Sequence, residues 1–449
     1  MTTIPQTAPT APGYIPLLGH ALRLAHPKRL GYVQALRAHG PVVKILIGPR
    51  EVYVLNSPAA LQQMLLAPSG TFTKGMLFDR TRPFFGNGIL SSNGPFHRRQ
   101  RRMIQPAFHK QRITEYFDRM SALAAKHIGA WAPDTPFTAD HRMRETATQL
   151  ISHTLFTSQA ATRMAAVVAR ALPVITTGVA WRTLAPADFL YRIPLPANRR
   201  FDTLCAELRE TTQELIRSHQ AEGTDQADLV SLLLSARDTD GLPMSEEELR
   251  DEIITIFTAG VETAATTLAW ACHILTTRPE LTNQLRAEAD DVLGDRPIAY
   301  SDLERLRLTG AFINEILRAF HPTWLLMRRT TGPVVLDGVA IPAQAEILYS
   351  PTTLHRDPLL YPDPDRFDPD RWLDGRTDTL PRCAYIPFSA GNRQCIGDSF
   401  AIAELHIVLT TLLRRWLIEP VPGRRARETA HAVLYPRNLA VTVIAPPPR

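Results

Sequence analysis

The spacing of apolar positions divides the chain into a long helical middle and β-rich segments near both ends. From residue 61 to about 280, apolar residues recur three and four positions apart, as in amphipathic helices. Two runs rich in β-branched residues, 42–47 and 51–55, flank Gly48-Pro49 and predict a hairpin. Further β-rich runs lie at 334–349 and 440–444. We therefore predict a mainly α fold with a smaller β-rich lobe assembled from distant segments.

The most apolar stretch, 253–275, is long enough as a helix of about 34 Å to cross a bilayer or a whole domain. Glu262 and the many threonines would be costly in lipid, so a buried core helix is the favoured interpretation. No terminal stretch approaches the ~20 apolar residues of an anchor, and the start of the chain lacks a signal-peptide pattern. We expect a cytoplasmic protein with no membrane span.

The organisation of the chain predicts one domain over residues 1–449. There is no internal repeat and no long linker, and the proline-rich start, about 1–13, predicts an extended tail. The 449 residues are 45% hydrophobic and 21% charged, which excludes disorder as the dominant state. A formal net charge of +6 is too small for a nucleic-acid coat but allows a local basic patch.

Cysteine carries the first candidate chemistry. The chain has four cysteines, Cys205, Cys272, Cys383 and Cys395, with no C-x-x-C spacing, so a disulfide scaffold is not expected. Cys395 lies between two glycines that allow tight turns, just before a helix predicted at 400–416. The backbone N–H groups and dipole of a helix N-terminus stabilise a thiolate, and a thiolate is a good axial ligand for haem iron. Taken alone, a cysteine in this position is more often a packed core residue.

The residues around this cysteine change that interpretation. Phe388, Gly391, Arg393, Cys395 and Gly397 form the pattern F-x-x-G-x-R-x-C-x-G, which resembles the haem-binding signature of the cytochrome P450 family. Five fixed residues match by accident in roughly one chain in ten thousand. The resemblance implies the cytochrome P450 fold, haem b ligated by Cys395, and the other four residues placed around the haem.

The resemblance continues along the chain in the family's order. Glu315-Ile-Leu-Arg318 looks like the family's E-x-x-R helix motif, and Pro364-Asp-Arg-Phe367 looks like the segment that supplies the third member of that network. Glu and Arg three apart also occur on many exposed helices, so the motif is weak by itself. Within the resemblance, Glu315, Arg318 and Arg366 are expected to form a buried charge cluster that supports the cysteine loop.

The middle of the long apolar helix carries a second motif. Ala259-Gly260-Val261-Glu262-Thr263 matches the family's pattern of small residue, Gly, any residue, acid and Thr. Thr263 could open the helix by bonding a carbonyl one turn back, and Gly260 removes a side chain, which together would make a groove for dioxygen. The resemblance implies that Glu262 and Thr263 organise proton delivery during oxygen activation. The alternative is that Glu262 only pairs with a neighbouring cation.

The densest basic run, residues 97–102, could be a solvated helix face, a nucleic-acid patch or an anion site. His97 and Arg101 share one helix face by their four-residue spacing. The resemblance implies that His97, Arg101, Arg328 and Arg393 hold the haem propionates, with Arg329 able to exchange roles with Arg328. No nucleic-acid partner is expected.

The same resemblance suggests where electrons arrive. Arg98 and Arg102 fall toward the side on which the family receives electrons, and a basic surface would steer a small acidic iron–sulfur protein. The chain has no room after the helix at 400–416 for a fused flavin or ferredoxin domain. We therefore expect a monomer that takes electrons from a separate ferredoxin and ferredoxin reductase, and indirectly from NAD(P)H.

The family's pocket-lining positions map onto residues 80–93, 254–263 and 322–326 and a turn near 432. The expected members are Phe84, Phe85, Ile89, Thr255, Thr258, Ala259, Trp324, Leu325, Leu326 and Ala432. Apart from two threonine hydroxyls the set offers few hydrogen-bonding groups, which suits a hydrocarbon-rich ligand. Any of these side chains could instead be core, as we expect for Phe257.

Residues 93–102, 193–201 and 387–391 resemble bacterial terpene-oxidising members of the family. The prediction is a haem-thiolate monooxygenase that inserts one oxygen atom from O2 into a C–H bond of a small hydrophobic molecule, a sesquiterpene-like terpenoid or another secondary metabolite. The alternatives are a peroxide-driven peroxygenase, against which the acid–Thr pair argues, and a non-catalytic haem protein. A zinc site is excluded because no second thiolate or His cluster lies near Cys395 in sequence.

Overall fold

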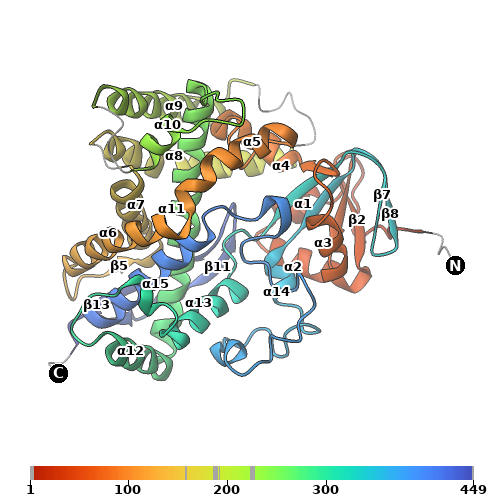
Figure 1. The fold of residues 1–449 in the computed structure, drawn as a ribbon. Helices are drawn as coiled ribbons and strands as arrows, with labels where there is room; N and C mark the ends of the chain where they lie inside the picture. Colours follow the sequence, from red (N-terminus) through yellow and green to blue (C-terminus); the bar gives the residue numbers. More distant parts are fainter. Residues whose placement is uncertain (1–4, 157–158, 186–190, 192, 223–227, 447–449) are drawn as a thin grey trace.

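A computed structural model describes residues 5–156, 159–185, 191, 193–222 and 228–446. The helices are α1 (Ala21–Ala25), α2 (Arg29–Ala35), α3 (Pro58–Leu65), α4 (Met76–Phe85), α5 (Gly94–Ile104), α6 (Lys110–Gly129), α7 (Ala139–Leu155), α8 (Gln159–Leu184), α9 (Pro196–Glu222), α10 (Leu229–Ser235), α11 (Glu246–Thr277), α12 (Pro279–Leu293), α13 (Arg307–Ala319), α14 (Pro351–His355) and α15 (Asp398–Arg415). The strands are β1 (Gln6–Thr7), β2 (Val42–Ile47), β3 (Arg50–Leu55), β4 (Phe72–Lys74), β5 (Phe137–Thr138), β6 (Leu326–Thr330), β7 (Val334–Leu336), β8 (Val339–Ile341), β9 (Glu346–Tyr349), β10 (Leu417–Pro420), β11 (Arg427–Ala430), β12 (Leu434–Arg437) and β13 (Ala440–Ile444). Most helices gather in one lobe, while β2, β7 and β8 with α1–α3 lie in the other (Figure 1), which confirms the mainly α fold with a smaller β-rich lobe.

The largest sheet has the strand order β2-β3-β9-β6-β4 and joins segments from both ends of the chain. The predicted hairpin is confirmed, because β2 and β3 pair antiparallel with Val43 opposite Val54. β3 then pairs parallel with β9, and β6 lies between β9 and β4. Strand β6 was not predicted, although it carries Arg328. The sheet therefore brings that arginine beside a strand far away in sequence.

The N-terminal segment belongs to the β-rich lobe. It is extended as predicted, but β1 pairs parallel with β8 and Thr10 forms a bridge with Lys44. Ala11 is buried among the sheet residues. Residues 1–4 of the expected tail lie outside the described residues, as do 447–449 at the other end. From residue 5 onward the segment is thus docked on the sheet rather than free.

Helix α11 passes through the helical lobe and is the element that positions the site. The Ser245 hydroxyl accepts from the Glu248 N–H, and the Glu248 side chain accepts from the Ser245 N–H, a reciprocal cap that starts the helix. Two helices, Ala160–Leu184 and Glu246–Thr277, are long and apolar enough to cross a membrane by length and composition alone. Most of the apolar part of α11 is buried against other elements of the fold. The prediction of a buried core helix is confirmed.

Candidate active site

The loop before α15 presents Cys395. The Cys395 N–H donates to the Phe388 carbonyl oxygen at 2.8 Å, and the Gln394 N–H donates to the Gly391 oxygen at 3.1 Å. Gly391 has φ +68°, and a Cβ there would lie 2.1 Å from the backbone oxygen of Leu65, so only glycine fits. The turn places the cysteine three positions before Asp398, the first residue of α15.

The thiol of Cys395 differs from the other three. Cys205, Cys272 and Cys383 are buried, whereas Cys395 is accessible to solvent, and all four are free. Protein atoms around the thiol displace most of its hydrating water, and this desolvation raises the pKa of Cys395. The backbone N–H of Gly397 opposes the rise by favouring the thiolate. The helix-terminus effect expected from the sequence is present but is outweighed by desolvation. An accessible thiol enclosed by protein is suited to binding a group inside the fold.

Basic side chains from four separate segments converge beside this loop: Lys74 from β4, His97 and Arg101 from α5, Arg328 from β6 and Arg393 from the loop itself. Burial, followed by the charges of Arg328 and Arg393, holds the pKa of Lys74 well below its ordinary value. Burial, followed by the charges of all four neighbours, lowers the pKa of His97 to about 3. Burial and the charges of Arg328 and Arg101 lower the pKa of Arg393 to about 10. The cluster therefore favours a negatively charged ligand.

Within the described residues, these basic groups have no carboxylate partner. The Arg393 guanidinium donates to the Ser92 carbonyl oxygen at 2.8 Å and to Asn93 Oδ1 at 3.2 Å, both uncharged acceptors. The Lys74 ammonium lies 4.2 Å from the ring centroid of Phe78. Buried cations without counter-charges, next to an accessible thiol, fit a haem with two propionates and a thiolate axial ligand.

The structure distinguishes Arg328 from Arg329, whose roles the sequence left open. Arg329 bonds Glu346 through Nε at 2.7 Å and Asp79 through Nη2 at 2.9 Å, so its charge is already balanced. Arg328 is buried and donates to the carbonyl oxygen of Met327. Arg328 is thus the member available to the anion site. Sequence reasoning missed Lys74, which reaches the site because β4 pairs with β6 in a register that places it opposite Arg328.

The basic run on α5 is divided by the helix faces. His97 is buried in the cluster, and Arg101 Nη1 donates to the Gln394 oxygen at 2.7 Å beside Cys395. Arg99 pairs with Asp238 at 2.6 Å and Glu248 at 2.7 Å and so ties α5 to the start of α11. Arg98 and Arg102 are exposed. One run therefore supplies an anion site, a structural tie and a basic surface.

On α11, the Thr263 hydroxyl donates to the Ala259 oxygen one turn back at 2.8 Å, as expected. Glu262 pairs with Arg144 of α7, with Nε 2.9 Å from Oε1, so the ion pair named as the alternative for Glu262 is present. A Cβ on Gly260 would lie 2.7 Å from Cδ1 of Ile151 in α7. Gly260 therefore permits close packing of α7 on α11, and the groove expected beside it stays a prediction.

The expected pocket residues come from α4, the loop after it, α11, the segment 324–326 at the start of β6, and the turn between β11 and β12. Phe84 and Phe85 pack together with centroids 4.4 Å apart. Thr255 is buried, and its hydroxyl is already bonded to the Asp251 oxygen at 2.7 Å. Thr258 is also buried, but its hydroxyl has no hydrogen-bond partner in the described part of the chain. This hydroxyl is a polar atom available to a ligand on that face of α11.

The remaining members of the expected pocket differ in burial. Ile89, Ala259, Leu325 and Leu326 are half-buried. Trp324 is buried in the core of the β-rich lobe, with its Nε1 donating to the carbonyl oxygen of His431. Ala432 is exposed in the turn between β11 and β12. Phe257 is fully buried against Phe156, as expected for a core residue.

Two acids that sequence reasoning missed hold the loop after α4. Asp251 Oδ2 accepts from the Asn87 N–H at 2.7 Å, and Glu252 Oε2 accepts from the Ile89 N–H at 2.9 Å. Burial raises the pKa of Glu252 to about 8 and raises that of Asp251 as well. A Cβ on Gly88 would lie 2.4 Å from Thr255 Oγ1, so the loop lies directly on α11. Two adjacent acids at the start of an apolar run are a signal that could have found this anchor.

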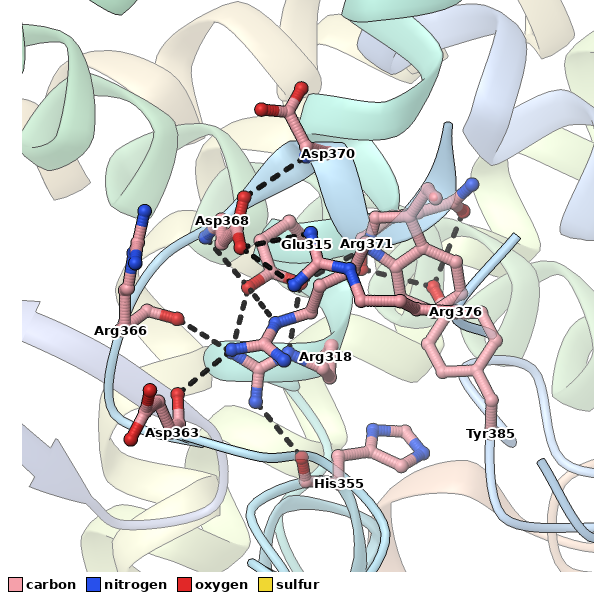
Figure 2. Close-up of polar contacts among 12 residues, drawn as sticks. Glu315, Arg318, His355, Asp363, Arg366, Asp368, Asp370, Arg371, Arg376 and Tyr385 are labelled. Carbon is pink, nitrogen blue, oxygen red and sulfur yellow. Dashed lines mark hydrogen bonds and ion pairs between the residues drawn. The ribbon is translucent and has the colours of Figure 1, made fainter. Parts of the chain in front are cut away.

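The buried charge network forms around Glu315 and Arg318 of α13 (Figure 2). Arg318 binds both carboxylate oxygens of Glu315, through Nε and Nη2, each at 2.8 Å, and donates from Nη1 to the His355 oxygen at 2.9 Å. The Glu315 oxygens also accept from the Asp368 N–H at 2.9 Å and from Trp372 Nε1 at 3.0 Å. The cluster joins α13 to the segment that follows α14.

The third guanidinium in this network is Arg371, and the prediction that it is Arg366 is wrong. Arg371 is buried with its Nε 3.4 Å from Glu315 Oε1, and its Nη2 donates to the Asp363 oxygen at 2.8 Å. Arg366 is exposed and contributes only its backbone oxygen, 3.4 Å from Arg318 Nη2. The physical reason is the 3₁₀ turn Pro369–Trp372, which directs Arg371 inward, whereas the Arg366 side chain points outward (Figure 2).

A mainly helical fold with an accessible cysteine before its last long helix, beside a buried cationic cluster, is the architecture of a haem-thiolate protein. Residues 9–443 match the family model "Cytochrome P450", and the chain belongs to that family. The expected fold and the expected enzyme class, a cytochrome P450 monooxygenase, are confirmed.

Similar proteins include two enzymes of Streptomyces. The chain is 38% identical to cyclooctatin synthase of Streptomyces melanosporofaciens, over 93% of this chain and 91% of that protein. It is 36% identical to pentalenene oxygenase of Streptomyces avermitilis, over 98% of both. A solved structure, retinoic acid bound cyanobacterial CYP120A1, has the same fold with a TM-score of 0.87 at 23% identity, covering 98% of this chain and 100% of that one.

Proposed function

We propose that this monooxygenase is a single-domain, monomeric cytoplasmic enzyme that inserts one oxygen atom from O2 into a C–H bond of a terpenoid, a sesquiterpene-like molecule or another apolar secondary metabolite. The observation that carries the proposal is the accessible Cys395 thiol beside the uncompensated cations Lys74, Arg328 and Arg393. The resemblance to cyclooctatin synthase and pentalenene oxygenase supports a terpenoid substrate.

Each residue of the site has a distinct task in this proposal. Bound haem supplies one-electron and dioxygen chemistry, tuned by the Cys395 thiolate. Lys74, His97, Arg101, Arg328 and Arg393 hold its carboxylates, as their convergence supports. The apolar side chains of α4 and of the turn before β6 exclude water and orient the substrate by shape.

Proton handling falls to Thr263 and Glu262. While its hydroxyl donates to the Ala259 oxygen, Thr263 keeps acceptor lone pairs on which a water molecule can be held. Arg144 fixes the position of the Glu262 carboxylate, because the two side chains form an ion pair at 2.9 Å. A charged carboxylate next to a hydroxyl-bound water can relay protons from solvent.

Thr263→Ala is expected to lower the product formed per electron pair by about tenfold and to release peroxide in its place, because the proton relay loses its inner hydroxyl. The measurement compares NAD(P)H consumption, peroxide and product with a ferredoxin and its reductase. Thr267→Ala is the matched control, since Thr267 makes the same 2.8 Å bond one turn further on, to the Thr263 oxygen. Unchanged coupling in Thr263→Ala would remove the proton role, and full turnover on peroxide alone would favour the peroxygenase alternative.

The exposed arginines of α5 give a test of the electron donor. Arg98 and Arg102 are exposed on the helix that also carries His97 and Arg101. Charge reversal in Arg102→Glu is expected to slow reduction by an acidic ferredoxin by about tenfold at low salt, with the difference shrinking as salt screens the attraction. Stopped-flow reduction at several ionic strengths measures this. Arg163→Glu, an exposed arginine of α8, is the control; equal slowing in both variants would contradict a docking site on α5.

A further inference from the structure

A second pocket lies apart from the cysteine loop and the basic cluster. It has a volume of about 750 Å³ and is bounded by α4, the end of α8 and the start of α9. Among its lining residues are four arginines and two aspartates, together with the apolar side chains of Pro83, Ile193 and Pro194. None of the residues that surround Cys395 lines it. The described lining residues carry more positive than negative charge, which distinguishes them from the apolar side chains predicted for the substrate pocket, although both sets draw on residues 80–93.

Arg182, near the end of α8, is the buried cation of this pocket. It is only 7% exposed, and its guanidinium carbon lies 3.6 Å from the ring centroid of Phe201 and 5.8 Å from that of Tyr191. Gly178 lies against this stacked pair, because a Cβ there would lie 2.6 Å from Cδ2 of Phe201 and 2.8 Å from Arg182 Nη1. The guanidinium is therefore held in one orientation by the protein before any ligand binds.

The hydrogen-bonding capacity of Arg182 is largely unused. A guanidinium has five N–H donors, and the contact found for Arg182 in the described residues is a long bond from Nη2 to Asn198 Oδ1 at 3.4 Å. Burial lowers the pKa of Arg182, and the charge of the exposed Asp202 only partly opposes this from outside ion-pair distance. Asp79, the other acid of the pocket, is already paired with Arg329 and Arg82. A buried charge in this state is stabilised by an anion that can accept two parallel hydrogen bonds.

We propose that this pocket binds the carboxylate of an apolar acid, with Arg182 as the bidentate partner of the carboxylate and with Pro83, Ile193 and Pro194 against the hydrocarbon body. A carboxylate matches the planar fork of arginine, and the stacking on Phe201 preserves that geometry. Because binding of the acid is measured directly, the test does not depend on its oxidation.

The test measures binding of farnesoic acid and of methyl farnesoate to the haem-loaded protein by isothermal titration calorimetry. The two probes share one hydrocarbon skeleton and differ in the carboxylate charge. Arg182→Gln is expected to weaken binding of the acid by about 10- to 100-fold and to leave binding of the ester within about twofold. Arg199→Gln is the matched control, because Arg199 lines the same pocket but is exposed. It is expected to change binding of the acid by less than about threefold.

Two further variants make the outcome decisive. Asp202→Asn removes the competing negative charge and is expected to strengthen binding of the acid a few-fold. Arg182→Lys keeps the charge and the packing stem but loses the bidentate fork, so it is expected to be intermediate; it serves as the main test if Arg182→Gln fails to fold by circular dichroism. Equal affinity of the wild type for acid and ester, or equal losses in Arg182→Gln and Arg199→Gln, would overturn the proposal and leave Arg182 as a structural cation stacked on Phe201.

Discussion

Cys395→Ala is expected to reduce turnover to background and to abolish the red-shifted absorption band that a thiolate-ligated haem gives when the protein is reduced and exposed to carbon monoxide. The reason is that Cys395 is the accessible cysteine, held by its own N–H bond to Phe388 and by the tight turn at Gly391. An alanine at this position leaves the loop intact but supplies no axial ligand.

The control for this variant is Cys205→Ala, which removes a buried free cysteine of α9 and is expected to keep both the band and the activity. Cys395→His separates ligation from loop structure, because an imidazole can bind iron without the electron donation of a thiolate. Its spectrum should change to that of histidine ligation, with loss of turnover. A thiolate-type band that survives in Cys395→Ala would transfer the ligand role to another cysteine.

Local patterns were sufficient for the parts of the fold that local chemistry determines. The hairpin β2–β3 follows from two β-rich runs around Gly48-Pro49, and the cysteine loop follows from its glycine spacing. The body of α11 follows from its apolar run, but its start at Glu246 was missed because the first turn is acidic. Ser245 and Glu248 are spaced as a capping box, so that signal was present in the sequence.

Contacts between distant segments account for what the sequence could not provide. Lys74 joins the basic cluster only because β4 pairs with β6, and a three-residue strand leaves little trace in the sequence. Arg182 meets Phe201 across two helices that must first be packed together. Gly260 matched the motif, but its contact with Ile151 depends on the packing of α7 against α11. In each case the residue type could be read from the sequence, but the residue that it contacts in the fold could not.

The error over the third member of the Glu315 network has a specific cause. Pro364-Asp-Arg-Phe367 and Pro369-Asp-Arg-Trp372 are near-copies five residues apart, so either arginine satisfies the same pattern. The 3₁₀ turn decides between them: in the second copy Asp368 accepts from the Asp370 N–H and Trp372 donates to Glu315. Both contacts direct Arg371 toward the buried carboxylate.

This difference gives the second large prediction. Arg371→Ala is expected to lower the free energy of unfolding by about 3 kcal/mol, because Glu315 keeps its bonds to Arg318 but loses part of the positive charge that compensates its burial. Arg366→Ala is expected to change it by less than about 0.5 kcal/mol, since its exposed side chain makes no contact with the cluster and its backbone oxygen remains. Urea unfolding of both variants, with haem content as a second measurement, distinguishes the two positions.

A larger loss of stability in Arg366→Ala than in Arg371→Ala would show that Arg366, in the first copy of the pattern, is the third member of the network. The predicted order would show that the turn at Pro369–Trp372, rather than the motif alone, places the charge that holds this segment against α13.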